Sequence, residues 1–173
     1  MLNNANAMEI DEIKNNDGVD AIMEIGFPGG YGFYGVADIL SGEANPSGHL
    51  TDTYTVTNAN SPAAQNFGNY EWTNADPSVN INAEEVEAED IYTGYKYYET
   101  RYADTVLGQG NADATVGSST GKAWNYDDEV SYPFGYGLSY TTFEQTLKSV
   151  DVDLANRTVT AEVDVKNYRR CCW

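Results

Sequence analysis

The chemically most suggestive pattern in the sequence is Gly30–Gly35, Gly-Tyr-Gly-Phe-Tyr-Gly, which has the G-x-G-x-x-G spacing of dinucleotide-binding loops. An apolar run precedes it and a helical pattern follows, so a pyrophosphate could meet a helix N-terminus. Asp52 lies roughly where an acid would bind a ribose. However, Pro28-Gly29 lengthens the turn, aromatic side chains crowd it, and no clean strand ends at Asp52. We therefore expect no cofactor and a loop that packs at a domain interface, with a dinucleotide-binding enzyme as an alternative.

Hydrolytic chemistry has two further candidates in the sequence. Residues 117–121 read Gly-Ser-Ser-Thr-Gly and match the G-x-S-x-G spacing around a nucleophilic serine, but a polar loop surrounds them where a strand and a helix are needed. The 27 Asp and Glu residues could also supply the pair of carboxylates for glycoside hydrolysis, which lie about 5 to 10 Å apart. Because spacing alone selects no pair, the residues by themselves nominate no catalytic side chain.

The sequence gives little evidence for metal or redox chemistry. Cys171 and Cys172 are adjacent, cannot easily bond each other, and define no disulfide framework. His49 is the single histidine, which argues against zinc sites rich in histidine. Residues 127–129, Asp-Asp-Glu, could bind a cation but are better interpreted as a solvated turn, and the sequon at 156–158 has meaning only in a secreted protein. We expect no metal site.

Charge excludes several classes of partner. The 173 residues carry 9 Lys and Arg against 27 Asp and Glu, which gives 9 − 27 = −18, and no Lys or Arg lies between Lys14 and Lys96. Such a surface repels phosphate backbones and anionic lipid, so we expect neither nucleic acid nor membrane partners. The sequence has no apolar run of about 18 residues. No signal peptide is visible at its start. The localisation stays open, with a cytoplasmic location favoured over the alternatives.

The elements that would position these groups begin with an α/β pattern. Residues 19–27 predict a strand buried on both faces, as in parallel sheets. Residues 31–41 place apolar side chains at helical spacing and predict a helix that ends at Gly42. Residues 50–56 alternate weakly, as an edge strand does, and 58–82 predict a long loop. Strand, glycine loop and helix in this order indicate one piece of a layered α/β sheet.

A tyrosine-rich segment and a β-hairpin follow. Residues 91–99 predict an extended segment, with Tyr95 and Tyr97 on one face and Tyr92 and Tyr98 on the other. These rings could stack on sugars, but packing between elements is the simpler interpretation. The acidic cluster at 84–90 is interpreted as a solvated face. Residues 147–153 and 158–166 predict a half-buried antiparallel pair, with Val159, Ala161, Val163 and Val165 on one face. A hairpin alone is marginal in water, so more strands are needed.

Several of these segments resemble glycoside hydrolase family 3, in the order that the family has them. The segments that carry the resemblance are Asn4–Glu9, Gly26–Gly29 with Ala37–Gly42, Asn45–Gly48, Ile91–Tyr98 and Pro133–Phe143. The resemblance covers residues 2 to about 167. It departs from the family's pattern at His49, where an Arg is usual, and at Asp90, where a Gly is usual.

The resemblance implies an α/β fold in two parts. Residues 1–138 would form the last part of the family's α/β sandwich domain, a partial sandwich of strand–helix units in a mostly parallel sheet, with a long linking segment. Residues 139–173 would form a truncated fibronectin-III-like β-sandwich. Residues 168–173 fit a frameshift, because one inserted base converts the family's usual Thr-Gly-Asp-Val-Ala-Gly into Tyr-Arg-Arg-Cys-Cys-Trp.

The resemblance also implies a function for a longer, bacterial parent protein: a retaining β-glycosidase, in particular a β-glucosidase that releases terminal β-linked glucose from oligosaccharides. The family's nucleophile is an Asp on a barrel domain and its acid/base is an upstream Glu, and neither matches a residue here. We therefore expect no catalytic residue in this chain, no hydrolysis by it alone, and contact with the β-glucoside through the missing barrel. The alternative is a non-catalytic carbohydrate-binding or scaffolding module.

Overall fold

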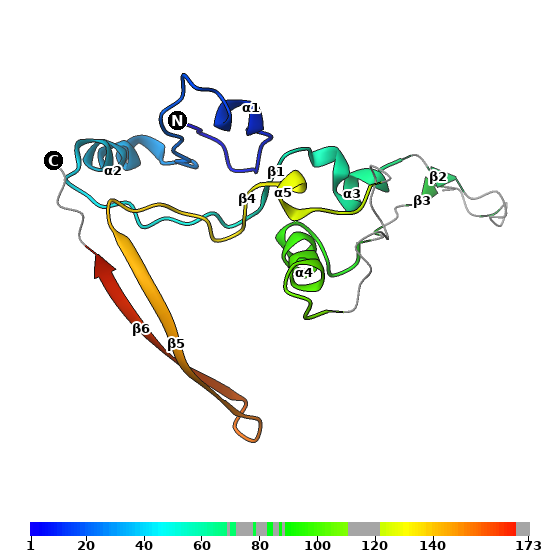
Figure 1. Cartoon of the computed structure of the whole chain (residues 1–173). Helices are drawn as coiled ribbons and strands as arrows, with labels where there is room; N and C mark the ends of the chain where they lie inside the picture. The colour runs from blue at the N-terminus through cyan, green and yellow to red at the C-terminus, as the bar shows by residue number, and fades with distance from the viewer. Residues whose placement is uncertain are drawn as a thin grey trace. The chain divides into compact units, whose positions relative to one another are not determined.

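The computed structural model describes residues 1–68, 70–71, 78, 83–84, 87, 89–110 and 122–168 (Figure 1). The elements are α1 (Asp11–Lys14), α2 (Gly29–Ser41), β1 (Tyr54–Thr55), η1 (Asn58–Asn60), α3 (Pro62–Gln65), β2 (Tyr70–Glu71), β3 (Ala83–Glu84), α4 (Tyr95–Thr105), α5 (Tyr126–Glu129), β4 (Val130–Tyr132), β5 (Thr142–Asp153) and β6 (Thr158–Tyr168). Within this part of the chain, no helix is both long and apolar enough to cross a membrane.

The contacts divide the chain into two units. The first unit contains residues 1–30 and 49–136, and the second contains residues 31–48 and 137–173. The strands pair as β1 with β4, β2 with β3, and β5 with β6, and each pair is antiparallel.

A short β-ladder organises the first unit. Tyr54 pairs with Tyr132 and Thr55 with Val130. The ladder extends through loop backbone, because the Leu50 amide donates to the Tyr136 carbonyl at 2.8 Å. The edge strand predicted over 50–56 is therefore present, but its regular part is limited to β1.

The strand predicted over 19–27 is wrong as a regular element. Only Glu24 pairs there, in a parallel bridge with Leu2, in which the Leu2 amide donates to Met23 and the Ile25 amide donates to Leu2. Because no described strand lies on the other side of this segment, its apolar residues have no second face to bury.

The tyrosine-rich segment corrects a second prediction. Residues 95–105 form the helix α4, whereas an extended segment was predicted over 91–99. Gly94 precedes the helix with φ of 56°, a left-handed conformation that favours glycine and breaks the chain direction. Tyr98, Arg101 and Tyr102 follow at helical spacing, and Tyr98 and Arg101 are buried. Tertiary packing of this face has overridden the strand propensity of the aromatic residues.

The core of the first unit is small and aromatic. Tyr98, Trp124 and Val130 form its buried cluster, with Tyr97 and Tyr126 packed against them. Tyr98 of α4 thus meets Trp124, from the loop before α5, and Val130 of β4, which lie more than 20 residues further along the chain. α4 and α5 lie side by side (Figure 1).

The helix predicted over 31–41 is confirmed as α2, which ends as expected before Gly42, a glycine with φ of 82°. None of its residues is buried, and Phe33 and Leu40 are exposed. In the second unit, the Tyr140 hydroxyl donates to the Ile39 carbonyl at 2.6 Å. The Asn45 side chain accepts from the Tyr140 amide at 2.9 Å, so the Asn-Pro-Ser-Gly turn is tied to the start of the hairpin.

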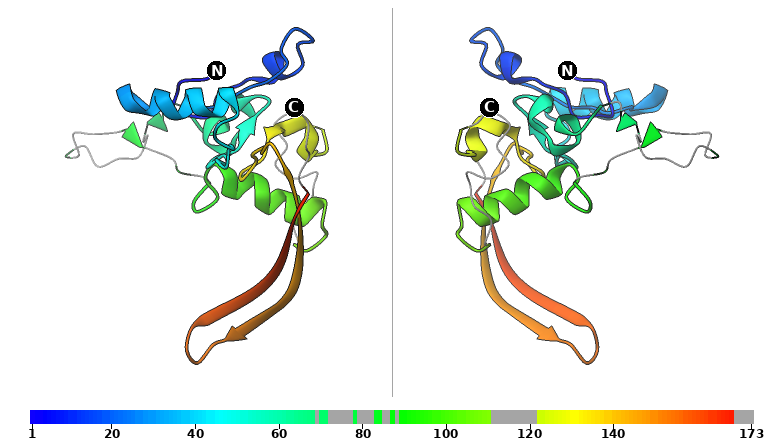
Figure 2. Two further views of the ribbon diagram at one scale, coloured as in Figure 1. Left: turned by 90° about the vertical axis from the view of Figure 1, so that its left-hand side faces the viewer. Right: turned by 90° about the vertical axis from the view of Figure 1, so that its right-hand side faces the viewer.

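The predicted hairpin is confirmed as β5 and β6, which run side by side along their length (Figure 2). Val152 lies opposite Val159, Val150 opposite Ala161 and Leu147 opposite Val163, so these apolar side chains share one face. A register shift falls between Leu147 and Ser149. The prediction that the pair is half-buried is wrong, since every residue of β6 is exposed. Among the described residues, nothing covers the apolar face.

Candidate functional site

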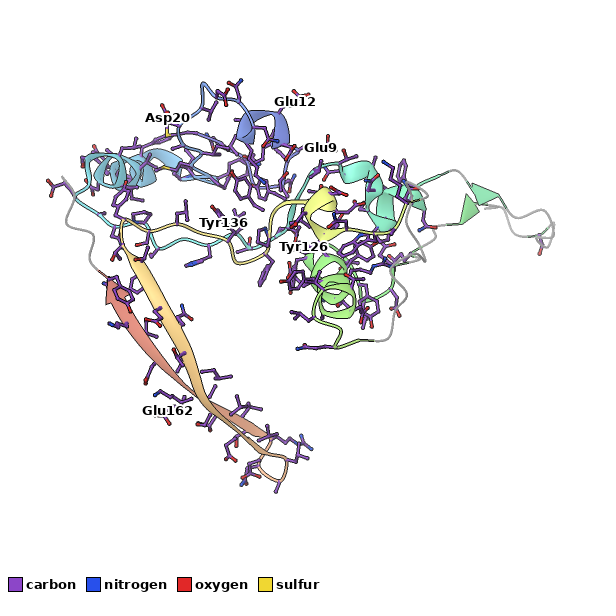
Figure 3. The ribbon with its side chains drawn as sticks, viewed as in Figure 1. Glu9, Glu12, Asp20, Tyr126, Tyr136 and Glu162 are labelled. Atoms are coloured by element: carbon purple, nitrogen blue, oxygen red, sulfur yellow. The ribbon has the colours of Figure 1, made fainter. Side chains whose placement is uncertain are left out.

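The first unit contains a cleft of about 620 Å³. Its walls come from an N-terminal segment (Ala5–Ala7), the chain into β1, the η1–α3 segment, and residues 89–94 with the first turn of α4. The N-terminal segment is attached through Glu9, labelled in Figure 3, whose Oε1 accepts from the Asn58 amide at 2.6 Å. Three parts of the chain, residues 5–7, 52–67 and 89–98, therefore line one space.

Asp52 is held at one wall of the cleft. Its Oδ1 accepts from the Thr53 amide at 2.8 Å. The same oxygen lies beside Gly94, where an added Cβ would be 3.3 Å away. Gly94 combines this close approach with a positive φ of 56°, so a larger residue would be strained there and would press on the carboxylate.

Three residues of the lining each have a polar side-chain atom that is shielded from solvent and has no hydrogen-bond partner among the described residues: Thr53 Oγ1, Tyr98 Oη and Glu89 Oε2. Thr53 is 4% exposed and Tyr98 is 3% exposed, while Glu89 is half-buried. A buried polar atom without a partner costs about 1–3 kcal/mol, so native structures seldom leave several of them along one wall.

The Tyr98 hydroxyl is neutral over the ordinary pH range. Burial raises its pKa well above the usual value, and the negative charges of Glu129 and Asp52 raise the pKa further. The group can therefore both donate and accept a hydrogen bond.

Behind Tyr98, a buried cation and a buried carboxylate support the wall. The Arg101 guanidinium lies 5.0 Å from the ring centre of Trp124 and 6.0 Å from that of Tyr97. Glu129, at the end of α5, accepts from the Asn60 side chain at 3.1 Å. Next to it, Tyr126, labelled in Figure 3, donates to Glu99 Oε1 at 3.0 Å.

The lining determines what this cleft can do chemically. It offers two carboxylates, Asp52 and Glu89, together with neutral hydroxyls, so it disfavours anions and favours groups that donate hydrogen bonds. Within the described part of the chain, no three His, Cys, Asp or Glu side chains come together as metal ligands do.

The glycine motif and the acid paired with it have separate surroundings. The segment Gly30–Gly35 lies within α2, with its glycines in helical backbone and its aromatic rings exposed. Asp52 lines the cleft of the first unit. The expected interface packing of the glycine segment stays a prediction.

The other candidate motifs contribute no residue to the lining of the cleft, or they lie outside the described residues. Residues 127–129 belong to α5, where Glu129 is buried. The sequon at 156–158 lies at the turn between β5 and β6. The G-x-S-x-G segment at 117–121, both cysteines and residues 169–173 of the proposed frameshift lie outside the described residues.

The sequence did not single out the residues that matter most at the cleft. Thr53 and Glu89 lie in segments interpreted as an edge strand and a solvated acidic face. One usable signal was present, because Arg101 and the tyrosines before it follow a helical spacing of buried positions. The preference for packing over exposed stacking is confirmed at Tyr98, and Tyr95 stacks on Phe134 with ring centres 4.2 Å apart.

Comparison with known proteins gives a consistent result. A family model described as the glycosyl hydrolase family 3 C-terminal domain matches residues 1–140. The chain is 32% identical over 157 residues to Beta-glucosidase B of Emericella nidulans, covering 90% of this chain and 15% of that protein. It is 30% identical over 161 residues to Beta-glucosidase BoGH3A of Bacteroides ovatus, covering 93% of this chain and 17% of that protein.

A solved structure gives the same indication. A beta-glucosidase from Paenibacillus barengoltzii superposes with a TM-score of 0.53 at 32% sequence identity, covering 85% of this chain and 12% of that chain. The chain thus spans less than a fifth of the length of these relatives.

Proposed function

The chain belongs to glycosyl hydrolase family 3, and we propose from that premise that it serves as one section of a retaining β-glucosidase that releases terminal β-linked glucose from oligosaccharides. The observation that carries the proposal is the match of the family model to residues 1–140, together with β-glucosidases at about 30% identity in two distant organisms. In this role the section supplies shape and binding surface.

The two-part organisation is included in the proposal. Residues 1–138 act as the later part of an α/β sandwich with its linking segment, and residues 139–173 act as the start of a fibronectin-III-like sandwich. The parallel bridge between Leu2 and Glu24 and the helix α2 support the first assignment. The long antiparallel hairpin of β5 and β6 supports the second.

The reacting groups lie outside these 173 residues in this proposal. The nucleophile belongs to a barrel domain and the acid/base to an upstream segment, so the chain alone hydrolyses nothing and meets the β-glucoside through that barrel. The small share of each relative that the chain spans supports this division.

Two assays test the proposal. The complete reading frame of the parent gene, expressed as one protein, should release glucose from cellobiose with retained anomeric configuration, followed by proton NMR. The 173-residue chain should give no turnover of an aryl β-glucoside. Turnover by the chain that Asp52→Asn or Glu89→Gln abolishes would overturn the division of roles, and a full-length protein inert toward β-glucosides would overturn the function.

A second function is a non-catalytic carbohydrate-binding module. The observation that favours it is the cleft, which combines carboxylates and unpartnered hydroxyls with the exposed ring of Tyr92. Full-length protein that binds cellobiose without cleaving it would select this function over the first.

A further inference from the structure

We infer that Asp17-Gly18, in the turn that follows α1, is a site of spontaneous isomerisation of aspartate to isoaspartate, and that the side chain of Asn16 restrains the reaction. The inference is independent of the proposed function, because it needs neither a sugar nor the rest of a longer protein. It concerns covalent modification of this chain by its own backbone, with water as the only co-reactant.

The modification takes place in two balanced steps. The Gly18 amide nitrogen attacks the side-chain carboxyl carbon of Asp17, a C–N bond forms, and the carboxyl hydroxyl leaves with the amide hydrogen as water. The resulting five-membered succinimide then takes up one water. Addition at the side-chain carbonyl restores aspartate, whereas addition at the main-chain carbonyl breaks the original peptide bond and leaves the chain running through the side-chain carbonyl, as isoaspartate. No electron is transferred, and the final mass equals the initial mass.

The residue after the aspartate decides whether this attack is sterically possible. Asp17-Gly18 is the single Asp-Gly pair in the sequence. Because glycine has no Cβ, its backbone nitrogen can approach the preceding side chain without steric hindrance. Asp20, labelled in Figure 3, lies in the same exposed segment but is followed by Ala21, so it provides an internal comparison.

The turn around Asp17 gives the pair room to react. Residues 12–20 are all exposed, and Asp17 and Gly18 belong to neither a helix nor a strand. Among the described residues, no hydrogen bond or ion pair engages the Asp17 carboxylate. The turn is closed locally, because the Val19 amide donates to the Asn16 carbonyl at 2.9 Å. Exposed backbone with local hydrogen bonds opens at a small free-energy cost, so the reactive geometry is accessible from the folded chain.

One contact of the turn opposes the attack. The Gly18 amide donates to Asn16 Oδ1 at 2.8 Å, in an exposed contact between residues two apart. The attacking nitrogen must lose the hydrogen that this bond holds, so the reaction waits until the bond opens. Local side-chain bonds to the backbone compete with other conformations and contribute modestly in water. The Asn16 side chain therefore slows the isomerisation without preventing it.

The test is incubation of the 173-residue chain in mildly acidic buffer at body temperature, followed by mass spectrometry with electron-transfer fragmentation, which distinguishes isoaspartate from aspartate at equal mass. We expect isoaspartate to accumulate at residue 17 and not at Asp20. Gly18→Ala should slow the accumulation at least about ten-fold, and its Cβ, 3.1 Å from Asn16 Oδ1, needs only a small shift of an exposed side chain. Absence of isoaspartate at residue 17, equal accumulation at Asp20, or an unchanged rate in Gly18→Ala would overturn the site.

Asn16→Ala tests the restraint. Loss of Oδ1 should raise the rate of isomerisation about three-fold in the folded chain, and the increase should vanish in concentrated urea, where the bond is absent from both chains. The matched control is Asn15→Ala, because the Asn15 side chain donates to Asp11 Oδ2 at 2.7 Å, so this substitution should leave the rate unchanged. An unchanged rate in Asn16→Ala, an equal increase in Asn15→Ala, or an increase that persists in urea would overturn the role of Asn16.

Discussion

The aromatic cluster of the first unit and the β5–β6 hairpin of the second differ in how they treat apolar side chains. In the cluster, Tyr98 of α4 packs with Trp124 and Val130, which lie more than 20 residues later in the chain, and the three side chains bury one another. In the hairpin, neighbours such as Val150 and Val163 lie on one regular face and stay exposed. The hairpin has the longer ladder and the cluster has the burial.

Regular strand pairing and the burial of apolar side chains are therefore separate contributions to stability. Backbone hydrogen bonds close a ladder locally, but each contributes only about 0.5–1.5 kcal/mol net. Apolar burial contributes about 25 cal/mol per Å² removed from water and needs a covering layer. Among the described residues the hairpin has no such layer, so we expect the first unit to hold most of the folding free energy.

The largest expected effect comes from replacing an apolar side chain with alanine in each region. Trp124 is 6% exposed, and Trp124→Ala should lower the free energy of unfolding of the first unit by about 3–5 kcal/mol, because it removes the largest side chain of the cluster. Val163, 44% exposed, is the matched position in the hairpin, and Val163→Ala should cost less than about 1 kcal/mol.

Hydrogen exchange followed by mass spectrometry measures both effects, because peptides of α4 report on the cluster and peptides of β5 and β6 report on the hairpin. A similar loss of protection from the two substitutions would contradict the comparison. It would mean that the hairpin face is covered in solution, for example by a second copy of the chain, which sedimentation velocity would detect.

Alkaline pH should destabilise the cluster. Burial is the first cause that raises the pKa values of several tyrosines in the first unit: Tyr54, Tyr97, Tyr98, Tyr126 and Tyr132. An unfolded tyrosine ionises near pH 10. Above that pH the unfolded chain releases protons that the folded unit retains, so the stabilisation is complete below pH 10 and is lost as pH rises through the folded values.

Absorbance of tyrosinate at 295 nm and near-ultraviolet circular dichroism follow this transition together. We expect a cooperative loss of the aromatic signal above pH 10. At Tyr126, the hydrogen bond to Glu99 also raises the pKa, so Tyr126→Phe should make the loss less steep. Independent, gradual ionisation of all tyrosines without loss of the dichroic signal would show that the rings are not buried in solution.

The parts of the fold that could be predicted from sequence are those that follow local periodicity. α2 has apolar residues at helical spacing and a glycine at its end, and the hairpin alternates polar and apolar side chains. α4 was missed because tyrosines favour strands intrinsically. The burial of its Tyr98 and Arg101 depends on Trp124 and Val130, whose positions no local pattern reveals.

The cleft could not be predicted for a related reason. Thr53 lies in a weakly alternating segment, Glu89 in an acidic cluster interpreted as a solvated face, and Tyr98 in a tyrosine-rich segment interpreted as packing between elements. What distinguishes them is the lack of a hydrogen-bond partner, which is a property of the folded chain alone. The sequence motifs that do have chemical spacing, such as Gly30–Gly35, lie in regular exposed helix.

Substitution of one cationic side chain in each region should give a smaller difference in the free energy of unfolding. Arg101 is 9% exposed and its planar group lies over Trp124, so Arg101→Lys should cost the first unit about 1–2 kcal/mol while the charge is kept. In the hairpin, Lys148 pairs with Asp164 at 2.8 Å, but the two side chains are 49% and 62% exposed. Lys148→Met should therefore cost less than about 0.5 kcal/mol. Urea unfolding monitored by exchange in α4 and β5 compares them, and a costlier Lys148→Met would contradict the ranking.

The smallest effect is expected at the hairpin turn, on the acid side of the pH scale. The Asn156 side chain and amide donate to the Asp153 carboxylate at 2.7 and 3.0 Å, and these bonds lower the pKa of Asp153. The resulting stabilisation is present above the unfolded value and is lost as pH falls through the lowered folded pKa. Asn156→Ala should therefore raise the pKa of Asp153 toward 3.8, measured from the pH dependence of its carboxyl carbon shift. Leu154→Ala, at an exposed turn position that leaves both bonds intact, should not move the pKa. If Asn156→Ala also leaves the pKa of Asp153 unchanged, the hydrogen bonds from Asn156 to Asp153 are not formed in solution. The hairpin turn would then be less ordered than the pairing of β5 with β6 indicates.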